Sequence, residues 1–174
     1  MKILITGKPR SGKTTLIKNI LASIPKLSYG GFFTEEIKEN NLRIGFKIKT
    51  TFGDEAIMSS QDFKSKFRIA KYGVNVAAID TVGISSLQRA AKENDIIVID
   101  EIGKMEMCSK RFVGAVRELF SKTDKTIIAT IPISTSIPLI NELKTQKDVK
   151  IFDARIDSID NIKKACLELL KSQK

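Results

Sequence analysis

The chain has 174 residues, of which 42% are hydrophobic and 29% are charged, and thirty Lys and Arg against twenty Asp and Glu give a formal net charge of +10. This length and composition fit one domain with an ordinary core and exclude a disordered chain. The absence of histidine excludes His-based acid–base catalysis, Ser-His-Asp triads and the usual Cys/His zinc sites. Any catalysis must therefore use carboxylates, lysine, arginine, hydroxyls or a hard metal ion held by oxygen.

The apolar runs and the charge pattern limit the partners. Runs such as 96–99 are far too short to span a bilayer, and residues 1–7 lack the apolar stretch of a signal peptide, so we expect a cytoplasmic protein without membrane contact. The net charge favours an anionic partner, but no block of five or more like charges appears, and most of the excess is interpreted as solvated surface. The charge permits nucleic acid as a partner, although no motif indicates it. The oligomeric state stays open, and a monomer is compatible with the sequence.

The first half of the chain predicts a strand, a helix and a hairpin. Residues 2–5 form a short buried strand, followed by a turn rich in Gly, Pro and Ser and by a helix that ends at Pro25. In the segment 30–58, apolar stretches flank an Asn-Asn turn, which predicts an antiparallel hairpin and a third short strand. Residues 59–73 carry no clear pattern. A strand is expected over 74–79.

The second half alternates between buried strands and helices. We expect helices at 84–91, 112–120, 138–143 and 159–170, the last capped by Asp157 or Ser158, and strands at 96–99, 126–131 and 149–152. Continuous apolar strands that alternate with helices predict an α/β fold, with a mainly parallel sheet covered by helices on both faces. Since no repeat or linker is present, we expect a single domain over 1–174, with about 30–58 as a hairpin insertion.

The turn after the first strand carries a phosphate-binding motif. Residues 7–14 read Gly-Lys-Pro-Arg-Ser-Gly-Lys-Thr, a complete match to the P-loop pattern G-x-x-x-x-G-K-[ST]. The backbone N–H groups of such a loop surround phosphate oxygens at the start of a helix. Lys13 is expected to reach the β- and γ-phosphates, the Thr14 hydroxyl to ligate Mg²⁺, and Thr15 to meet the α-phosphate. The nucleotide-binding residues predicted from this segment are Gly7, Lys8, Pro9, Arg10, Ser11, Gly12, Lys13, Thr14 and Thr15.

Two acids follow the buried strand at 96–99. Ligands of open α/β sheets bind outside the carboxyl ends of the strands, so Asp100 is expected to act on Mg²⁺ through water. Glu101 is expected to orient the attacking water, because a glutamate is the natural base where histidine is absent. Gly103 and Lys104 extend the predicted nucleotide site. Two interpretations of Lys104 stay open: it supplies positive charge to the transition state, or it is a surface lysine.

Three further residues have open roles. The sequence does not decide whether Thr130, at the end of the next strand, senses the γ-phosphate or has no role. It also does not decide whether Glu35 and Glu36 on the hairpin face the site or only solvent.

Two other functions compete with hydrolysis. A D-x-x-G string at 80–83 and a string at 145–148 resemble motifs of switch GTPases, but the strand expected before Asp80 is weak and 137–144 looks helical. The other alternative is a small nucleotide or nucleoside kinase, in which an acceptor replaces water. Its expected arginine-rich lid is not evident, because the arginines before Asp100 are scattered.

The motifs together resemble a known family, the small nucleoside-triphosphatases with thermophile and vertebrate cancer-related branches. The matching segments are 7–14, 31–36, 43–46, 72–75, 100–106 and 129–132. The resemblance implies a fold related to the RecA-like ATPases, Mg²⁺-dependent hydrolysis of ATP, GTP and other NTPs to NDP and phosphate, and a catalytic role for Glu101. One departure is Lys38, where the family often carries arginine, since lysine lacks the bidentate fork.

Overall fold

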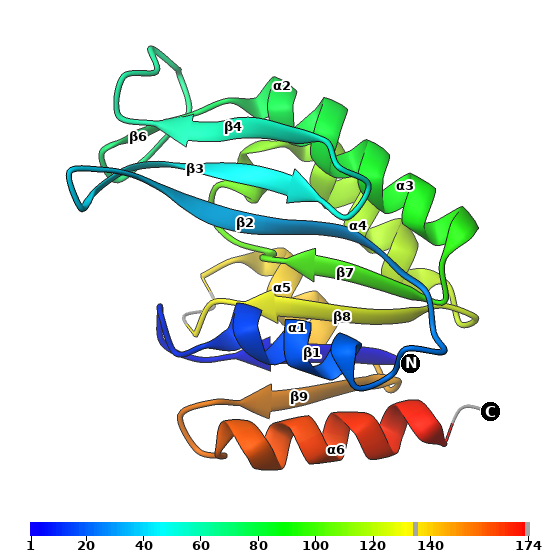
Figure 1. Ribbon diagram of the computed structural model, residues 1–174. Coiled ribbons are helices and arrows are strands. Elements are labelled where there is room, and N and C mark those ends of the chain that lie inside the picture. Colours follow the sequence, from blue (N-terminus) through cyan, green and yellow to red (C-terminus); the bar gives the residue numbers. More distant parts are fainter. Residues whose placement is uncertain (134–135, 173–174) are drawn as a thin grey trace.

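The computed structural model describes residues 1–133 and 136–172. One mixed sheet runs through the whole molecule (Figure 1), with the strand order β5-β6-β4-β3-β2-β7-β8-β1-β9. The strands are β1 Lys2–Thr6, β2 Tyr29–Glu39, β3 Leu42–Thr50, β4 Glu55–Ser60, β5 Arg68–Ile69, β6 Tyr72–Val74, β7 Ile96–Asp100, β8 Thr126–Ile131 and β9 Val149–Asp153. The helices are α1 Lys13–Ala22, α2 Val76–Ala78, α3 Ile84–Glu93, α4 Lys110–Ser121, α5 Pro138–Lys144 and α6 Ile159–Lys171, with a π-helical turn η1 at Ile79–Gly83 and a 3₁₀ turn η2 at Glu106–Cys108.

The parallel half of the sheet brings several strand ends to one edge. Strands β2, β7, β8, β1 and β9 run parallel, and β1, β7 and β8 are buried over nearly their whole length. Such strands read as continuous apolar runs because helices cover both of their faces. The carboxyl ends of β1, β7 and β8 therefore lie side by side, where the loop after β1 and the acid of β7 meet.

The other half of the sheet is antiparallel and extends the parallel half without a break. Residues 29–33 of β2 pair with β7, and β2 also pairs with β3 from Phe32 to Glu39. Among the described residues, four strand pairings are parallel and four are antiparallel. The predicted mainly parallel sheet thus describes β2, β7, β8, β1 and β9, whereas the predicted hairpin is an extension of the same sheet. Its turn lies at Asn40 and Asn41, which adopt φ values of 48° and 63°.

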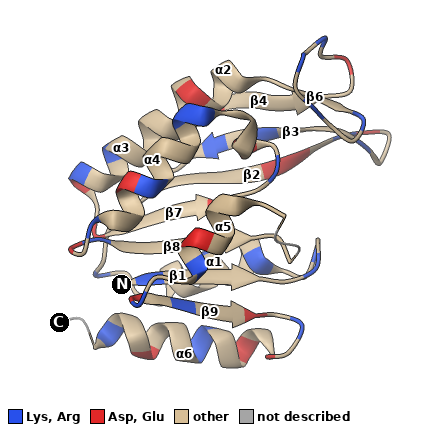
Figure 2. Ribbon diagram, turned by 180° about the vertical axis from the view of Figure 1, so that it is seen from behind, with Lys and Arg blue, Asp and Glu red and all other residues tan. Residues whose placement is uncertain are grey.

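Helices cover both faces of the parallel half, as predicted. Helices α1 and α6 pack on one face around Ile3, Ile5 and Val98, while α3, α4 and α5 pack on the other around Leu4, Ile97 and Ile99 (Figure 1). Helix α6 is capped by Ser158, whose Oγ accepts a hydrogen bond from the N–H of Asn161 at 3.2 Å. Basic and acidic residues are interspersed along the helices (Figure 2), which fits the interpretation of the net charge as solvated surface.

The prediction of a strand over 74–79 is wrong. Only Val74 belongs to a strand, and the chain turns into a helix at Asn75, whose side-chain oxygen accepts the N–H of Ala78 at 3.2 Å. An asparagine cap of this kind starts a helix, so residues 76–83 continue through the π-helical turn into α3. Within the described ranges, no helix has the length and apolar character needed to cross a membrane.

Candidate active site

The glycine-rich loop, residues 7–12, joins the end of β1 to the start of α1. Gly12 has a φ of 85°, a conformation that favours glycine, and its carbonyl accepts the N–H of Leu16 at 2.8 Å as the helix begins. At Gly7 a side chain would meet Ser11 Oγ at 2.8 Å and Ala154 Cβ at 3.0 Å. The backbone conformation favours glycine at position 12, and the close approach of Ser11 and Ala154 favours it at position 7. The loop leaves its backbone N–H groups at the amino end of α1.

Lys13 folds back over this loop. Its Nζ donates to the carbonyl oxygens of Gly7 at 3.1 Å and of Lys8 at 3.0 Å, and the residue is only 9% exposed. A buried ammonium needs such acceptors, and main-chain carbonyls of the loop provide them. The cation is thus held inside the loop, where an anion bound to the N–H groups would also meet it.

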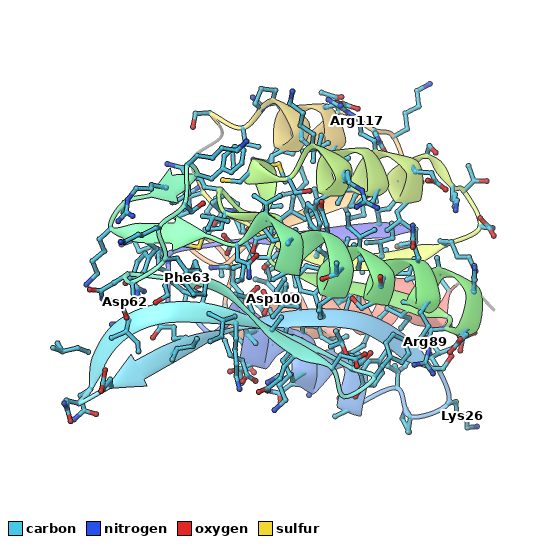
Figure 3. The ribbon with its side chains drawn as sticks, turned by 90° about the horizontal axis from the view of Figure 1, so that it is seen from above. Lys26, Asp62, Phe63, Arg89, Asp100 and Arg117 are labelled. Atoms are coloured by element: carbon cyan, nitrogen blue, oxygen red, sulfur yellow. The ribbon has the colours of Figure 1, made fainter. Side chains whose placement is uncertain are left out.

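Asp100 ends β7 and links three elements. Its Oδ2 accepts the hydroxyl of Thr14 on α1 at 2.5 Å, and its Oδ1 accepts the hydroxyl of Thr130 on β8. Burial raises the pKa of Asp100, while the bonds from Thr130 and Thr14 and the charges of Lys13 and Lys18 act in the opposite direction. Asp100 is 4% exposed, and it lies near the middle of the view in Figure 3, whereas Lys26 and Arg117 lie near the edge of that view. The two hydroxyls fix the orientation of the carboxylate at the edge where the parallel strands end.

Two more carboxylates follow on the next loop. Burial raises the pKa of Glu101, Lys13 lowers it and Asp100 raises it. Glu106, on η2, is 3% exposed, and its Oε2 accepts the N–H of Gly103 at 3.1 Å. Burial and the neighbouring Glu101 raise the pKa of Glu106 to about 8. A side chain added at Gly103 would meet Glu101 Oε1 at 2.6 Å and Glu106 Oε2 at 2.9 Å, so the two carboxyl groups lie on the same side of this glycine.

Most of these residues line a cleft of about 790 Å³. Three parts of the chain contribute to the lining: the glycine-rich loop with the start of α1, the acids at and after the end of β7, and the hairpin wall, which we define as Thr34, Glu36, Arg43 and Phe46. The lining residues are Gly7, Pro9, Arg10, Gly12, Lys13, Thr14, Thr15, Thr34, Glu36, Arg43, Phe46, Met58, Ile69, Asp100, Glu101, Lys104, Met105, Glu106, Pro132 and Ile133. The cleft is therefore charged at the loop and the acids, and partly apolar at the hairpin.

The hairpin wall is held together by charge. Glu36 pairs with Arg43 at 2.8 Å, with Arg10 at 3.4 Å and with Lys38 at 3.5 Å. The Arg43 guanidinium also donates to Tyr72 Oη at 3.0 Å and lies 5.0 Å from the centre of the Phe46 ring. Burial raises the pKa of Glu36, but the three cations outweigh it and hold that pKa below its ordinary value. Glu36 thus gathers positive charge at the mouth of the cleft.

Most of the predicted site residues come together in the cleft. Lys104 is exposed there. Three predicted residues are not among the lining: Lys8 supplies a carbonyl to Lys13, Gly103 donates its N–H to Glu106, and Ser11 Oγ is buried beside Gly7. Thr130 is fully buried beneath Asp100.

The sequence did not identify the hairpin wall as part of the site. Glu36 was one of two open candidates. Arg43 and Phe46 entered only as part of the segment 43–46 of the family resemblance, with no role in the site, and Met58 and Ile69 were not candidates. Strand alternation was the available signal, since Glu35 and Glu36 must face opposite sides of β2. Glu35 lines a separate hollow of about 500 Å³ with Lys18, Phe33 and Lys49.

The acids of the two segments that resemble GTPase motifs, 80–83 and 145–148, bind residues outside the cleft. Asp80 lies in η1, accepts the hydroxyl of Ser109 and pairs with Arg111 at 3.6 Å. It follows a helical segment, because the strand expected before it is absent from that described stretch. Asp148, in the other string, pairs with Lys2. Neither residue is among those lining the cleft.

The relationship to known proteins agrees with this geometry. A family model described as NTPase matches residues 2–167. The chain belongs to this NTPase family. It is 43% identical over 171 residues to the nucleoside-triphosphatase THEP1 of Thermotoga maritima strain MSB8, covering 98% of this chain and 96% of the relative. It is 32% identical over 173 residues to the cancer-related nucleoside-triphosphatase homolog of Mus musculus, covering 92% and 91% of the two chains.

Solved structures show the same fold. The crystal structure of THEP1 from Aquifex aeolicus matches with a TM-score of 0.88 at 40% identity, covering 98% of this chain and 99% of that one. The solution structure of a human cancer-related nucleoside triphosphatase matches with a TM-score of 0.83 at 29% identity, covering 99% and 98%. The family resemblance, the P-loop NTPase fold and the enzyme class predicted from the sequence are confirmed.

Proposed function

We propose that the chain hydrolyses nucleoside triphosphates to diphosphates and phosphate in a Mg²⁺-dependent reaction that tolerates different bases. The observation that carries this proposal is the meeting of Thr14, Asp100, Glu101 and Lys13 in one cleft, with Thr14 Oγ1 2.5 Å from Asp100 Oδ2. The names of the relatives, nucleoside-triphosphatases that specify no base, support it.

The glycine-rich loop and Lys13 bind the phosphates in this proposal. The two acceptors that Lys13 now uses are neutral carbonyl oxygens. Phosphate oxygens carry more negative charge and form stronger, charge-assisted hydrogen bonds with an ammonium. Lys13 therefore moves its donors from the loop carbonyls to the β- and γ-phosphates, while the N–H groups at the start of α1 meet the other oxygens.

The oxygen atoms of Thr14 and Asp100 fit a magnesium ion. Mg²⁺ is held in enzymes by one or two carboxylates together with substrate phosphates and waters, and it prefers oxygen ligands. Within the described residues, no group of three or more His, Cys, Asp or Glu could hold a metal ion. When bound, the ion neutralises charge on the phosphates. Thr130 orients the Asp100 carboxylate from below through its hydroxyl.

Glu101 receives the proton in the hydrolytic step. The oxygen of a water forms a bond to the γ-phosphorus, the water's proton passes to a carboxylate oxygen of Glu101, and the bond from the γ-phosphorus to the β–γ bridging oxygen breaks. Burial raises the pKa of Glu101, which makes its carboxylate a better proton acceptor than a solvated one. Lys104, exposed in the same cleft, adds positive charge as the transition state develops.

A second candidate is transfer of the γ-phosphate to a nucleotide or nucleoside acceptor. The observation that favours it is the apolar part of the cleft, where Phe46, Met58, Ile69 and Met105 lie on the lining together with Glu101. Such side chains suit a ring or base rather than a phosphate.

The test measures phosphate release from MgATP and MgGTP without any acceptor. We expect Glu101→Gln to retain nucleotide binding and to lower kcat by about 10²–10⁴, the usual contribution of a general base. The control is Glu118→Gln on the exposed side of α4, where the side chain is 72% exposed, and it should match the wild type. Full hydrolysis by Glu101→Gln would remove that residue from the mechanism. Turnover that requires an added nucleoside or nucleotide would establish the second candidate instead.

A further inference from the structure

An ion pair bridges the glycine-rich loop and the hairpin wall across the mouth of the cleft. Arg10 Nη2 donates to the two carboxylate oxygens of Glu36 at 3.5 and 3.4 Å. The two residues come from the loop after β1 and from the middle of β2, and both line the cleft. The bridge therefore crosses the space next to the residues that we propose to bind the triphosphate.

Arg10 occupies an unusual backbone position. Its φ is 62°, in the left-handed region that only a few per cent of residues other than glycine adopt. This conformation directs the side chain from the loop to Glu36. Arg10 lies two positions before Gly12 and three before Lys13. Its guanidinium therefore extends from the same short loop as the backbone N–H groups that we propose to bind phosphate.

The contacts of Glu36 are unequal. Arg43 is held firmly, since it donates to Glu36 at 2.8 Å and to Tyr72 Oη at 3.0 Å. Arg10 makes only long contacts of 3.4–3.5 Å, and its side chain is 69% exposed. Exposed pairs of this kind contribute little to stability. Arg43 is therefore the fixed partner of Glu36, and Arg10 is the partner that can leave.

We propose that Arg10 exchanges Glu36 for the terminal phosphate of the bound nucleoside triphosphate. In the nucleotide-free protein, Glu36 holds the guanidinium at the mouth of the cleft. When the triphosphate binds, the guanidinium moves to the γ-phosphate oxygens and adds a cation next to Lys13. This inference rests on the proposed function and adds to it a sensor for the third phosphate.

The chemistry of both partners favours the exchange. A guanidinium binds phosphate through two parallel hydrogen bonds, and the γ-phosphate carries more charge than one carboxylate. Glu36 does not become an unpaired anion when Arg10 leaves, because Arg43 and Lys38 remain within 3.5 Å. A diphosphate ends short of this position, so it leaves Arg10 with Glu36.

The test compares the binding of a non-hydrolysable ATP analogue and of ADP, each with Mg²⁺, by calorimetry on the full chain. Arg10→Gly removes the side chain and suits the positive φ, whereas Glu36→Gln keeps the shape and removes the charge. We expect Arg10→Gly to weaken the analogue about tenfold and ADP by less than about threefold. Arg10→Lys, which keeps one charge without the fork, should recover part of the loss.

The decisive measurement is the double variant. Glu36→Gln should strengthen binding of the analogue about threefold by releasing Arg10, and this gain should vanish in the Arg10→Gly background. The matched control is another exposed Arg–Glu pair between two helices, Arg117 and Glu142 at 2.9 Å, whose Arg117→Gln and Glu142→Gln variants should bind both ligands like the wild type.

Two outcomes overturn the exchange while wild-type binding is intact. One is a gain from Glu36→Gln of equal size with and without Arg10, and the other is equal weakening of the analogue and ADP by Arg10→Gly. A wild-type protein that binds neither ligand would overturn the proposed function and this inference together.

Discussion

Thr14 and Asp100 are joined by a hydrogen bond of 2.5 Å although their positions in the sequence differ by 86. The bond connects the first turn of α1 to the end of β7 and places a hydroxyl and a carboxylate at one point of the sheet edge. Strand β8, whose Thr130 donates to the other oxygen of Asp100, lies between β7 and β1 in the sheet. A helix start and a strand end that are far apart in the sequence therefore share one support.

Substitution of Thr14 should separate metal binding from folding. Thr14→Ala removes a donor to Asp100 and a proposed magnesium ligand, and changes of this kind usually lower metal affinity or activity by about 10–100-fold. Thr14→Ser keeps the hydroxyl and should stay within a few-fold of the wild type. Phosphate release measured against Mg²⁺ concentration tests this, with the exposed Thr145→Ala as control. Equal Mg²⁺ requirements in Thr14→Ala and the wild type would contradict the assignment.

Lys104→Gln should lower kcat by about 10–100-fold with little change in KM, because its charge acts mainly on the transition state. The residue is exposed, so its loss should leave the thermal unfolding midpoint unchanged. Lys110, exposed at the start of α4 and not among the residues lining the cleft, is the matched control for a Lys→Gln change. An unaltered kcat in Lys104→Gln would make it a surface lysine.

Glu106 should make the stability of the nucleotide-free protein depend on pH. The pKa of its carboxyl group is raised from 4.5 to about 8 in the folded state. Between these values the native protein holds a proton that the unfolded chain has released, so the free energy of unfolding falls as the pH rises from about 4.5 to about 8. Each pH unit in this window costs up to about 1.4 kcal/mol.

Glu106→Gln cannot titrate and should lose this dependence while keeping an oxygen for the Gly103 N–H. Urea unfolding at pH 5 and pH 8, without Mg²⁺, should show the variant gaining about 2–4 kcal/mol relative to the wild type as the pH rises. Glu168→Gln on the exposed side of α6 is the control. Parallel pH profiles for Glu106→Gln and the wild type would refute a raised pKa.

Gly31→Ala should damage the junction of β2 and β7. Gly31 has a φ of 129°, and a Cβ there would lie 2.0 Å from the carbonyl oxygen of Val98. We expect a loss of about 3 kcal/mol or more in the free energy of unfolding. Gly114→Ala in the middle of α4, where a Cβ meets nothing within 4 Å, should instead stabilise by about 0.5–1 kcal/mol. Urea unfolding compares the two, and a neutral Gly31→Ala would show that β2 can shift away from β7.

The local parts of the site could be predicted from the sequence because each lies within a few residues of a strand end. The glycine-rich loop follows β1 and leads to Thr14, while Asp100 ends β7 and Glu101 comes next. The parallel order of β1 and β7 brings these residues together. Glu36 and Arg43 could not be placed in this way, since their position depends on which face of β2 and β3 points to the cleft. That face follows from the register of Gly31 against Val98, which no local pattern specifies.

The misassigned strand at 74–79 has a local cause. Val74, Val76 and Ile79 are residues of high β-propensity, and propensity alone favours a strand. The side chain of Asn75 outweighs it by capping the following turn, and Ala77 and Ala78 accept helical geometry readily. The signal available was an asparagine followed, after Val76, by two alanines. A helix predicted from it would also have removed the strand that the GTPase-switch interpretation needed before Asp80.

Strand β2 pairs with β7 at its start and with β3 through to its end. The hairpin wall is therefore a continuous extension of the central sheet that is anchored at one end. Such an extension of a sheet bends elastically and has no hinge about which it could rotate. Closure over a nucleotide must then be small in amplitude, and it must strain the same strand that fixes the register of Asp100. A force on Glu36 is therefore transmitted along β2 to Asp100 at the end of β7.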